Sequence, residues 1–157
     1  MTQNSADQAE HVKVEFRVPN EDGGVDVETM WAQPRGDDLY MLDNTPFYAY
    51  GISNEDIFRA SHEPNMEFPV FHSIYKKSGN RTLRIMFTQD EAKGSTSQST
   101  LDYLNEMGCA YEGADASFYA ITIPADTDLF EIATFLTDNE IMWEHSDPKY
   151  DDIYPKG

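Results

Sequence analysis

The sequence predicts an α+β fold, in which a small antiparallel β-barrel or half-barrel in the N-terminal half packs against a ferredoxin-like βαββαβ unit in the C-terminal half. Short segments with alternating apolar residues recur up to about residue 79, separated by turn residues; this pattern is typical of small antiparallel barrels. After residue 80, strand patterns alternate with two amphipathic helical patterns, in the order of a split βαβ unit. No flexible linker separates the halves, so we expect one α+β body.

The first two strands are predicted by apolar residues at every second position. The segment 11–18 carries valine and phenylalanine on one face and charged residues on the other. Residues 19–24 contain proline, asparagine, aspartate and glycine, which favour a turn. The next strand has a face formed by Val25, Val27, Thr29 and Trp31. Together the two segments predict a β-hairpin.

The stretch 42–56 is predicted to be a structural corner that follows a short strand at 39–42. It combines a proline, aromatic residues, a glycine that allows positive φ, and the polar run 53–56. This run matches the cap of a single helical turn, but residues 56–60 equally match a strand. We favour the strand, because Ile57 and Phe58 are β-formers. Another alternating strand is expected over 67–75.

Charge pairing gives a second reason to expect a corner there. Asp43 and Asp56 are acidic residues of the corner, and Arg81 and Arg84 lie in the strand that joins the two halves. We expect these aspartates to pair with one or both arginines and lock the corner against the second half.

The C-terminal half is expected to begin with a strand at 81–88 and a loop at 90–95. Ser95 with Gln98 matches a capping box, which predicts the start of a helix, and Gly108 suits the C′ position at its end. Short strands are then expected at 109–112 and 118–123. A second capping-box pair, Asp128 with Glu131, predicts the second helix, and the last strand is expected at 141–145.

These elements predict four regions along the chain. Residues 1–10 lack hydrophobic periodicity and are expected to be a disordered leader. Residues 11–79 form the antiparallel β unit, and residues 80–145 form the ferredoxin-like unit. Residues 146–157 are expected to be a loosely packed tail.

The charge of the chain narrows the class of partner. Its formal net charge is −18 and its pI is near 4.3, so we expect it to bind neither nucleic acid nor anionic membranes. A single cysteine, Cys109, excludes an internal disulfide. No apolar run approaches the length of a membrane span, and the N-terminus resembles no signal peptide. The prediction is therefore a cytoplasmic protein.

Catalytic and metal-binding patterns are missing from the sequence. The four histidines are scattered, and Pro64 prevents a metal-binding helix beside His62 and Glu63. Cys109 has no neighbouring basic group, so an inert buried thiol is expected. Without a set of acid, base and nucleophile, we predict that the protein is not an enzyme and takes no cofactor or metal.

An acidic surface is the main functional indication. Lysine and arginine are absent between Lys93 and Lys149, while acidic residues and aromatics alternate through that segment. Such a surface suits a basic protein partner, because charge steers encounter and aromatic rings anchor the complex. The predicted partner-binding residues are Tyr103, Glu106, Tyr111, Glu112, Asp115, Glu140, Trp143 and Glu144.

Two alternatives remain open at this stage. The acidic residues equally suit a surface that is only solvated. A small-molecule-sensing regulatory domain of ferredoxin-like type is the alternative function, since domains of that fold bind ligands and dimerise.

Three segments resemble a family of small bacterial proteins that is described only as a domain of unknown function. They are the Glu/Trp segment 28–32, the run 43–56 with its Asp-Asn-x-Pro-Phe turn and Gly-x-Ser-x-x-Asp stretch, and the Ser-Gly-x-x-Thr-x-Arg stretch 78–84. The resemblance covers roughly residues 12–145 and implies a bacterial, cytoplasmic protein. It supplies no catalytic residue. Immunity proteins that neutralise toxins are similar in type, as small acidic proteins.

Overall fold

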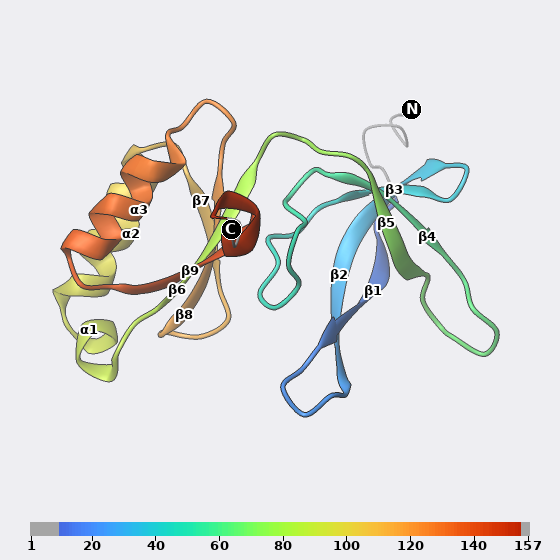
Figure 1. Cartoon of the computed structure of the whole chain (residues 1–157), viewed down its shortest axis with the longest axis horizontal. Helices are drawn as coiled ribbons and strands as arrows, with labels where there is room; N and C mark the ends of the chain where they lie inside the picture. The colour runs from blue at the N-terminus through green and yellow to red at the C-terminus, as the bar shows by residue number, and fades with distance from the viewer. Residues whose placement is uncertain (1–9, 155–157) are drawn as a thin grey trace, which may run out of the picture.

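The computed structural model describes residues 10–154 and places them in two β-sheets, the second of which carries helices (Figure 1). The predicted α+β class is therefore confirmed. Residues 1–9 of the predicted leader and residues 155–157 of the predicted tail lie outside the described residues.

The first sheet is a closed five-stranded barrel. Consecutive strands pair antiparallel, and β1 closes the barrel by pairing parallel with β5 through Glu15 and Val70. The strands are β1 (Val12–Pro19), β2 (Val25–Gly36), β3 (Leu39–Leu42), β4 (Ile57–Ser61) and β5 (Val70–Lys76). The preference for a strand after Asp56 is confirmed by β4.

The barrel interior is filled by the inward faces of these strands, and on β2 the inward face is not the one that carries Val25, Val27 and Trp31. Those side chains are 56%, 54% and 44% exposed, whereas Met30 is buried. Successive side chains of a strand point to opposite faces. The face that turns inward therefore determines, for every residue of the strand, whether its side chain is buried or exposed. The inward face also holds Glu28, whose carboxylate accepts hydrogen bonds from the backbone N–H groups of Phe47 and Ala49 in the loop that follows β3.

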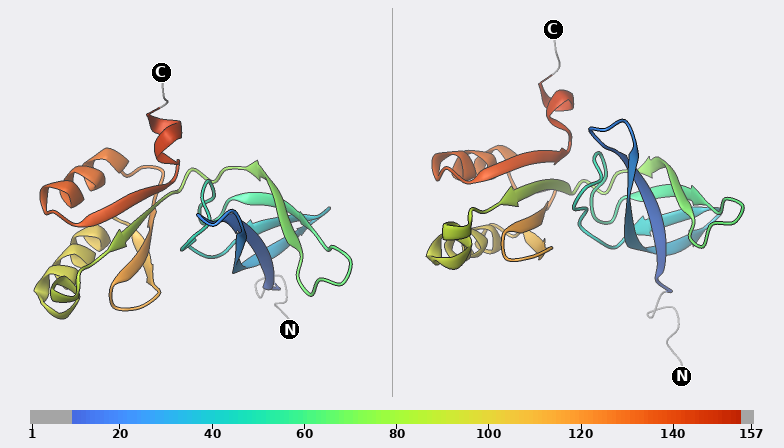
Figure 2. Two further views of the ribbon diagram at one scale, coloured as in Figure 1. Left: turned by 60° about the horizontal axis from the view of Figure 1, so that its bottom comes forward. Right: turned by 90° about the horizontal axis from the view of Figure 1, so that it is seen from below.

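The second sheet has four antiparallel strands in the order β7-β8-β6-β9. Its strands are β6 (Arg81–Met86), β7 (Ala110–Gly113), β8 (Phe118–Ile123) and β9 (Met142–Asp147). Helices α2 (Ser95–Glu106) and α3 (Leu129–Asp138) cover one face, and the barrel lies toward the other face (Figures 1 and 2). The sheet is thus the middle layer, and β7 and β9 are its two edges.

Helix boundaries differ from the prediction at one place. The expected loop at 90–95 contains a short helix, α1 (Gln89–Lys93), which Thr88 and Glu91 cap reciprocally. Helix α2 begins after Gly94 without a side-chain cap, so the predicted Ser95–Gln98 box is wrong. Both pairs fit the same motif, and the earlier pair is the one that the chain uses.

The end of the described chain is more structured than a loose tail. Strand β9 continues to Asp147, and both Ser146 and Asp147 are buried. A last short helix, α4 (Tyr150–Ile153), then packs beside the sheet. The buried residues after 145 therefore belong to the second sheet and not to the tail.

Candidate functional site

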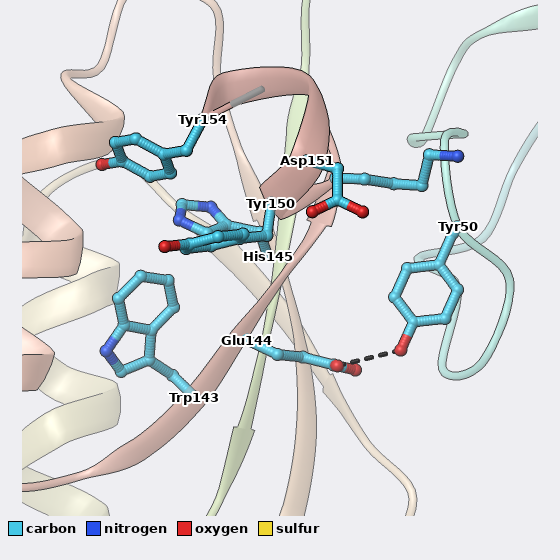
Figure 3. A pocket seen from close by; sticks show the side chains of 8 residues that line it. Tyr50, Trp143, Glu144, His145, Tyr150, Asp151 and Tyr154 are labelled. Atoms are coloured by element: carbon cyan, nitrogen blue, oxygen red, sulfur yellow. Dashed lines mark hydrogen bonds between the residues drawn. The ribbon is translucent and has the colours of Figure 1, made fainter. Parts of the chain in front are cut away.

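A pocket of about 800 Å³ lies beside the edge strand β9 (Figure 3). Strand β9 and helix α4 supply most of its walls, and Tyr50 from the barrel half supplies the opposite wall. Its lining residues are Tyr50, Trp143, Glu144, His145, Lys149, Tyr150, Asp151 and Tyr154. Aromatic rings beside carboxylates give this pocket a chemistry suited to a ligand with both apolar and basic groups.

The rings of the pocket pack on one another and hold α4 against β9. The His145 ring lies 4.7 Å from Trp143 between centroids, in an edge-to-face arrangement. The Tyr150 and Tyr154 rings are 4.9 Å apart. Such pairs favour tilted or edge-to-face geometry. Tyr150 nevertheless stays 59% exposed and Tyr154 47% exposed, so part of each ring is free for a ligand.

His145 is buried in this cluster, with 8% of its surface exposed. Its Nδ1 atom has no hydrogen-bond partner among the described residues. Burial lowers the pKa of His145 below its ordinary value, so the imidazole is neutral at pH 7. A buried polar atom without a partner is uncommon and costs stability, and this one is enclosed by the rings of Trp143, Tyr150 and Tyr154.

A second hollow, of about 380 Å³, continues the site along the other side of β9. It lies between β9 and α3, and it shares Trp143, His145 and Tyr154 with the first pocket. Phe130 of α3 lines it and is 51% exposed, and Met142 at the start of β9 is 65% exposed. We call the two hollows together, with the strand between them, the β9 edge site.

Tyr50 reaches the site because the corner loop, residues 43–56, is fixed from both sides. From the barrel, the buried Glu28 carboxylate accepts hydrogen bonds from the backbone N–H groups of Phe47, Tyr48 and Ala49, at 2.7, 3.1 and 2.8 Å. Charge-assisted bonds of this kind are among the strongest in proteins. They hold the loop in one shape.

From the second sheet, Arg84 holds the same loop. Its Nη1 donates to the Ala49 carbonyl oxygen at 2.9 Å, its Nε donates to Glu144 at 2.9 Å, and its guanidinium lies 4.5 Å from the Tyr50 ring centroid. The Tyr50 hydroxyl donates to Glu144 at 2.9 Å (Figure 3). Tyr50 and Glu144 are thus set in place across the junction of the two halves.

The predicted partners of the corner aspartates are wrong. Asp43 pairs with His11 at 2.6 Å, and Asp56 pairs with Lys77 at 2.6 Å. Arg84 instead meets corner-loop carbonyls and Glu144, and Arg81 donates to the carbonyl oxygens of Pro124 and Thr127. An arginine has several donors in a rigid fork, and backbone carbonyls satisfy it as well as a carboxylate does.

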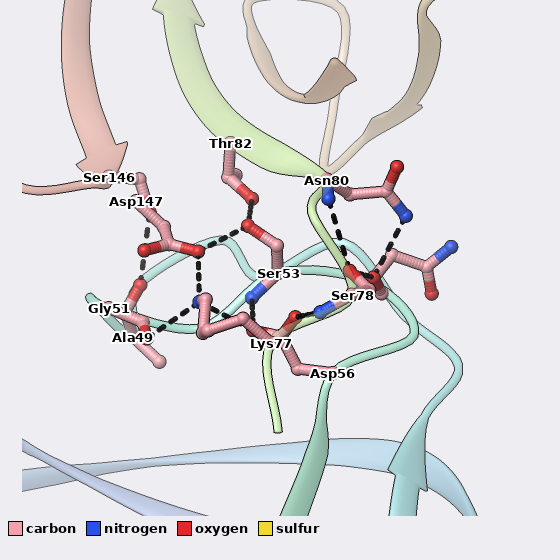
Figure 4. Close-up of polar contacts among 11 residues, drawn as sticks. Ala49, Gly51, Ser53, Asp56, Lys77, Ser78, Asn80, Thr82, Ser146 and Asp147 are labelled. Carbon is pink, nitrogen blue, oxygen red and sulfur yellow. Dashed lines mark hydrogen bonds and ion pairs between the residues drawn. The ribbon is translucent and has the colours of Figure 1, made fainter. Parts of the chain in front are cut away.

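Lys77 joins the two halves through buried carboxylates (Figure 4). Its ammonium contacts both Asp56 of the corner loop and Asp147 of β9. Ser53 is fully buried, and its hydroxyl donates to Asp147 at 2.6 Å. Ser53 and Lys77 resemble a catalytic serine–lysine pair in composition, but the buried serine is inaccessible to a substrate. These polar residues therefore have a structural role.

The eight residues predicted to bind a partner are split by the fold. Glu140, Trp143 and Glu144 lie at or next to β9, whereas Tyr111, Glu112 and Asp115 lie at or just after β7, the opposite edge. Tyr103 and Glu106 lie on α2. The acidic segment therefore forms at least two surfaces.

Several of these residues already have partners within the chain, among them Glu144, which binds Tyr50 and Arg84. Glu112 accepts a hydrogen bond from the Thr45 backbone N–H at 2.7 Å, and the Tyr103 ring stacks on Phe135 with 3.6 Å between centroids. The pocket of about 800 Å³ lies at the β9 edge. The sequence analysis missed six residues that line the pocket: Tyr50, His145, Lys149, Asp151, Tyr150 and Tyr154. The aromatic spacing of the tail was a usable signal for the last two.

The described residues contain neither a cluster of metal-ligating side chains nor a membrane-spanning helix. No group of three or more histidine, cysteine, aspartate or glutamate side chains among them could hold a metal ion. None of the described helices is both long and apolar enough to cross a membrane. Burial raises the pKa of the Cys109 thiol to about 11, which keeps it protonated and weakly reactive.

Comparison with known proteins identifies a family and a fold. The family model described as Domain of unknown function (DUF4265) matches residues 28–145. A structure titled as a novel crystal structure of a hypothetical protein from Neisseria gonorrhoeae is similar, with a TM-score of 0.74 and 15% identity over 90% of this chain and 97% of that chain. At this identity the similarity concerns the fold alone. No curated protein matches the chain.

Proposed function

Because the chain belongs to the family described as a domain of unknown function (DUF4265), we propose its role from its own geometry: it is a non-enzymatic, cytoplasmic protein-binding module. Its acidic surface at the β9 edge site binds a basic protein partner. An immunity protein that neutralises a toxin is one instance of this class, and the resemblance is one of size and charge.

The observation that best supports a protein-binding role is that exposed aromatic rings and exposed carboxylates lie together at one strand edge. Tyr50, Phe130 and Tyr150 are each about half exposed there, although burial of aromatic side chains is strongly favourable. Exposed acidic residues surround them: Asp138, Glu140, Glu144, Asp151 and Asp152. Aromatic anchors within a charged rim are the usual composition of a protein–protein binding site.

We further propose that the second half is a ferredoxin-like unit over residues 80–145, after an antiparallel unit over 11–79. The strand order β7-β8-β6-β9, with α2 and α3 covering one face of the sheet, supports this assignment. In such a unit β9 is an edge strand, which leaves one side of it open to a partner.

A capture experiment with a charge-reversal variant tests the proposal. The full chain is immobilised, a lysate of the source bacterium is passed over it at low and high salt, and each captured protein is purified and titrated against the chain by calorimetry. We expect a basic protein whose affinity falls steeply as salt rises, because exposed charges are screened. Capture without this salt dependence would contradict the proposal.

The variant Asp138→Lys locates the surface. Asp138 is exposed in the last turn of α3 and lines the β9 edge site, and a lysine there suits the helix dipole, so folding is preserved. We expect at least about tenfold weaker binding, since one charge reversal at a steered interface costs on the order of 1–2 kcal/mol. The matched control, Glu67→Lys, changes the same charge in the β4–β5 loop of the barrel. Equal losses in both variants would show that only net charge matters.

The pocket volume favours one second function, a small-molecule-sensing regulatory domain. About 800 Å³ lies within the range of ligand sites, and Tyr50 brings the barrel half into its wall. A thermal-shift screen with amino acids and nucleotides separates the two functions. A ligand that raises the melting temperature of the wild type but not of Tyr150→Ala would favour the sensor.

A further inference from the structure

We propose that the partner is held by strand addition: an extended basic segment pairs with β9 as a fifth strand of the sheet, in the groove between β9 and α3. This inference rests on the proposed function and names the form in which the partner binds. It follows from the open edge, the groove beside it and the charges around it.

Strand β9 has one free side. Its other side pairs with β6 from Met86 opposite Met142 to Thr82 opposite Asp147. Within residues 10–154, no further strand pairs with β9. Ser146 is bridged by Lys149 where the chain turns into α4, so the free part is residues 142–145. At about 3.3 Å per residue this edge is about 13 Å long. Edge strands leave alternate N–H and C=O groups unpaired, and an extended peptide satisfies them.

The groove beside this edge has the layout that strand addition uses. Helix α3 runs next to β9, and Phe130, Thr134 and Thr137 line the floor between them. An added strand would direct alternate side chains toward α3 and toward Tyr50, because successive side chains of a strand point to opposite faces. The His145 ring lies in the wall shared by both hollows.

Charge selects a basic segment as the occupant. Asp138 lines the hollow beside α3, and Glu144 and Asp151 line the larger pocket. Among the described residues, Lys149 is the only lysine or arginine that lines either hollow. A second copy of this chain, paired through its own β9, would bring a second set of these carboxylates to the same edge, and like charges close to one another destabilise a sheet. Lysine or arginine side chains of a basic segment would instead meet Asp138 and Asp151, which line the two hollows and are exposed.

The other open edge is a poorer site. Glu112 of strand β7 already binds the corner loop, and no residue of β7 lines either hollow of the β9 edge site. It therefore serves as an internal control for any effect of a peptide on exposed strand edges in general.

A synthetic peptide tests the inference on the full chain. The probe has seven residues that alternate lysine and valine, with blocked ends; its control replaces lysine by glutamate. We expect the lysine peptide to shift the amide NMR signals of residues 142–145 and to slow their hydrogen exchange, while the amides of β7 do not change. No effect of the lysine peptide at millimolar concentration, or an equal effect at β7, would overturn strand addition.

Backbone methylation separates pairing from charge attraction. Two further peptides carry N-methyl groups on one or the other alternate set of amides, which removes donors without changing charge. We expect one set to weaken binding at least about tenfold, as loss of several hydrogen bonds requires, and the other set to retain most of it. Equal binding of both peptides would overturn strand addition but leave the basic-partner function intact.

Two outcomes would point to other conclusions. Slowed exchange at β9 that rises with protein concentration alone would show a second copy on the edge and overturn the inference. An Asp138→Lys variant that binds its captured partner as tightly as the wild type would contradict the proposed function itself, and it would do so whatever the peptides show.

Discussion

Single buried polar side chains set the shape of the corner loop, and Glu28 is the most connected of them. We expect Glu28→Ala to lower the free energy of unfolding by about 3 kcal/mol, because three backbone N–H groups lose a charged acceptor in a buried place. Urea unfolding followed by circular dichroism measures the change. The adjacent Thr29→Ala, on the exposed face of β2, should change it by less than about 0.5 kcal/mol.

Cys109 is predicted to be inert in the folded protein. Burial raises the pKa of its thiol to about 11, so at pH 8 only on the order of 0.1% is the reactive thiolate. A coloured disulfide reagent should therefore label Cys109 slowly in buffer and rapidly in urea. Fast labelling of the folded protein at pH 8 would show an accessible, activated thiol and would contradict the burial argument.

His145 gives stability a dependence on pH. Burial lowers the pKa of the folded imidazole below its ordinary value of 6.5, so the unfolded chain binds the proton more readily. The contribution of His145 is complete above pH 6.5 and is lost as the pH falls through the folded-state pKa. We expect the midpoint of urea unfolding to decrease from pH 7.5 to pH 5.5, and to decrease less in His145→Phe. An equal decrease in both proteins would assign the effect to other groups.

At the scale of elements, alternation and capping predicted most of the secondary structure. Each strand from β1 to β9 was expected close to its place, because side-chain period depends on local sequence alone. Two features could not be read locally. The buried face of β2 carries Glu28, whose hydrogen-bond partners lie in the corner loop, distant in the sequence. Thr88 with Glu91 and Ser95 with Gln98 both match the capping-box motif, and only the first pair forms it, so the motif alone does not separate the two.

The cap of α3 is a local feature that can be tested. The Asp128 carboxylate accepts from the backbone N–H groups of Phe130 and Glu131 at 2.9 and 3.4 Å. We expect Asp128→Ala to lower the free energy of unfolding by about 1 kcal/mol, the usual cost of an N-cap. Asp126→Ala removes an equal charge from the same exposed turn without a capping bond and should cost much less; equal losses would mean that charge, and not the cap, stabilises this turn.

At the scale of the molecule, the candidate site was only partly predictable. Glu140, Trp143 and Glu144 were named from the acidic and aromatic composition of the segment, and they lie at or next to β9. Tyr111 was named by the same reasoning and lies at the opposite edge, because composition does not reveal strand order. Tyr50 enters the site from a loop more than ninety residues before β9, through contacts that only the folded chain creates.

The junction of the two halves should make the whole molecule unfold as one unit. The chain has two tryptophans, Trp31 in the barrel and Trp143 in β9, so Trp31→Phe and Trp143→Phe each leave one reporter for one half. We expect the two urea curves to coincide.

Adding Lys77→Met to each of these variants leaves Asp56 and Asp147 buried without their shared cation. We expect Lys77→Met to lower the free energy of unfolding by about 2–3 kcal/mol. The loss is not larger because the lysine side chain is partly exposed. The barrel and the second sheet should then melt at different urea concentrations, because Lys77 contacts one carboxylate on each side of the junction. The neighbouring Lys76→Met removes an equal charge without an ion pair among the described residues and should keep the curves together. Coincident curves in Lys77→Met would mean that Glu28, Arg84 and the corner-loop backbone couple the halves without the lysine.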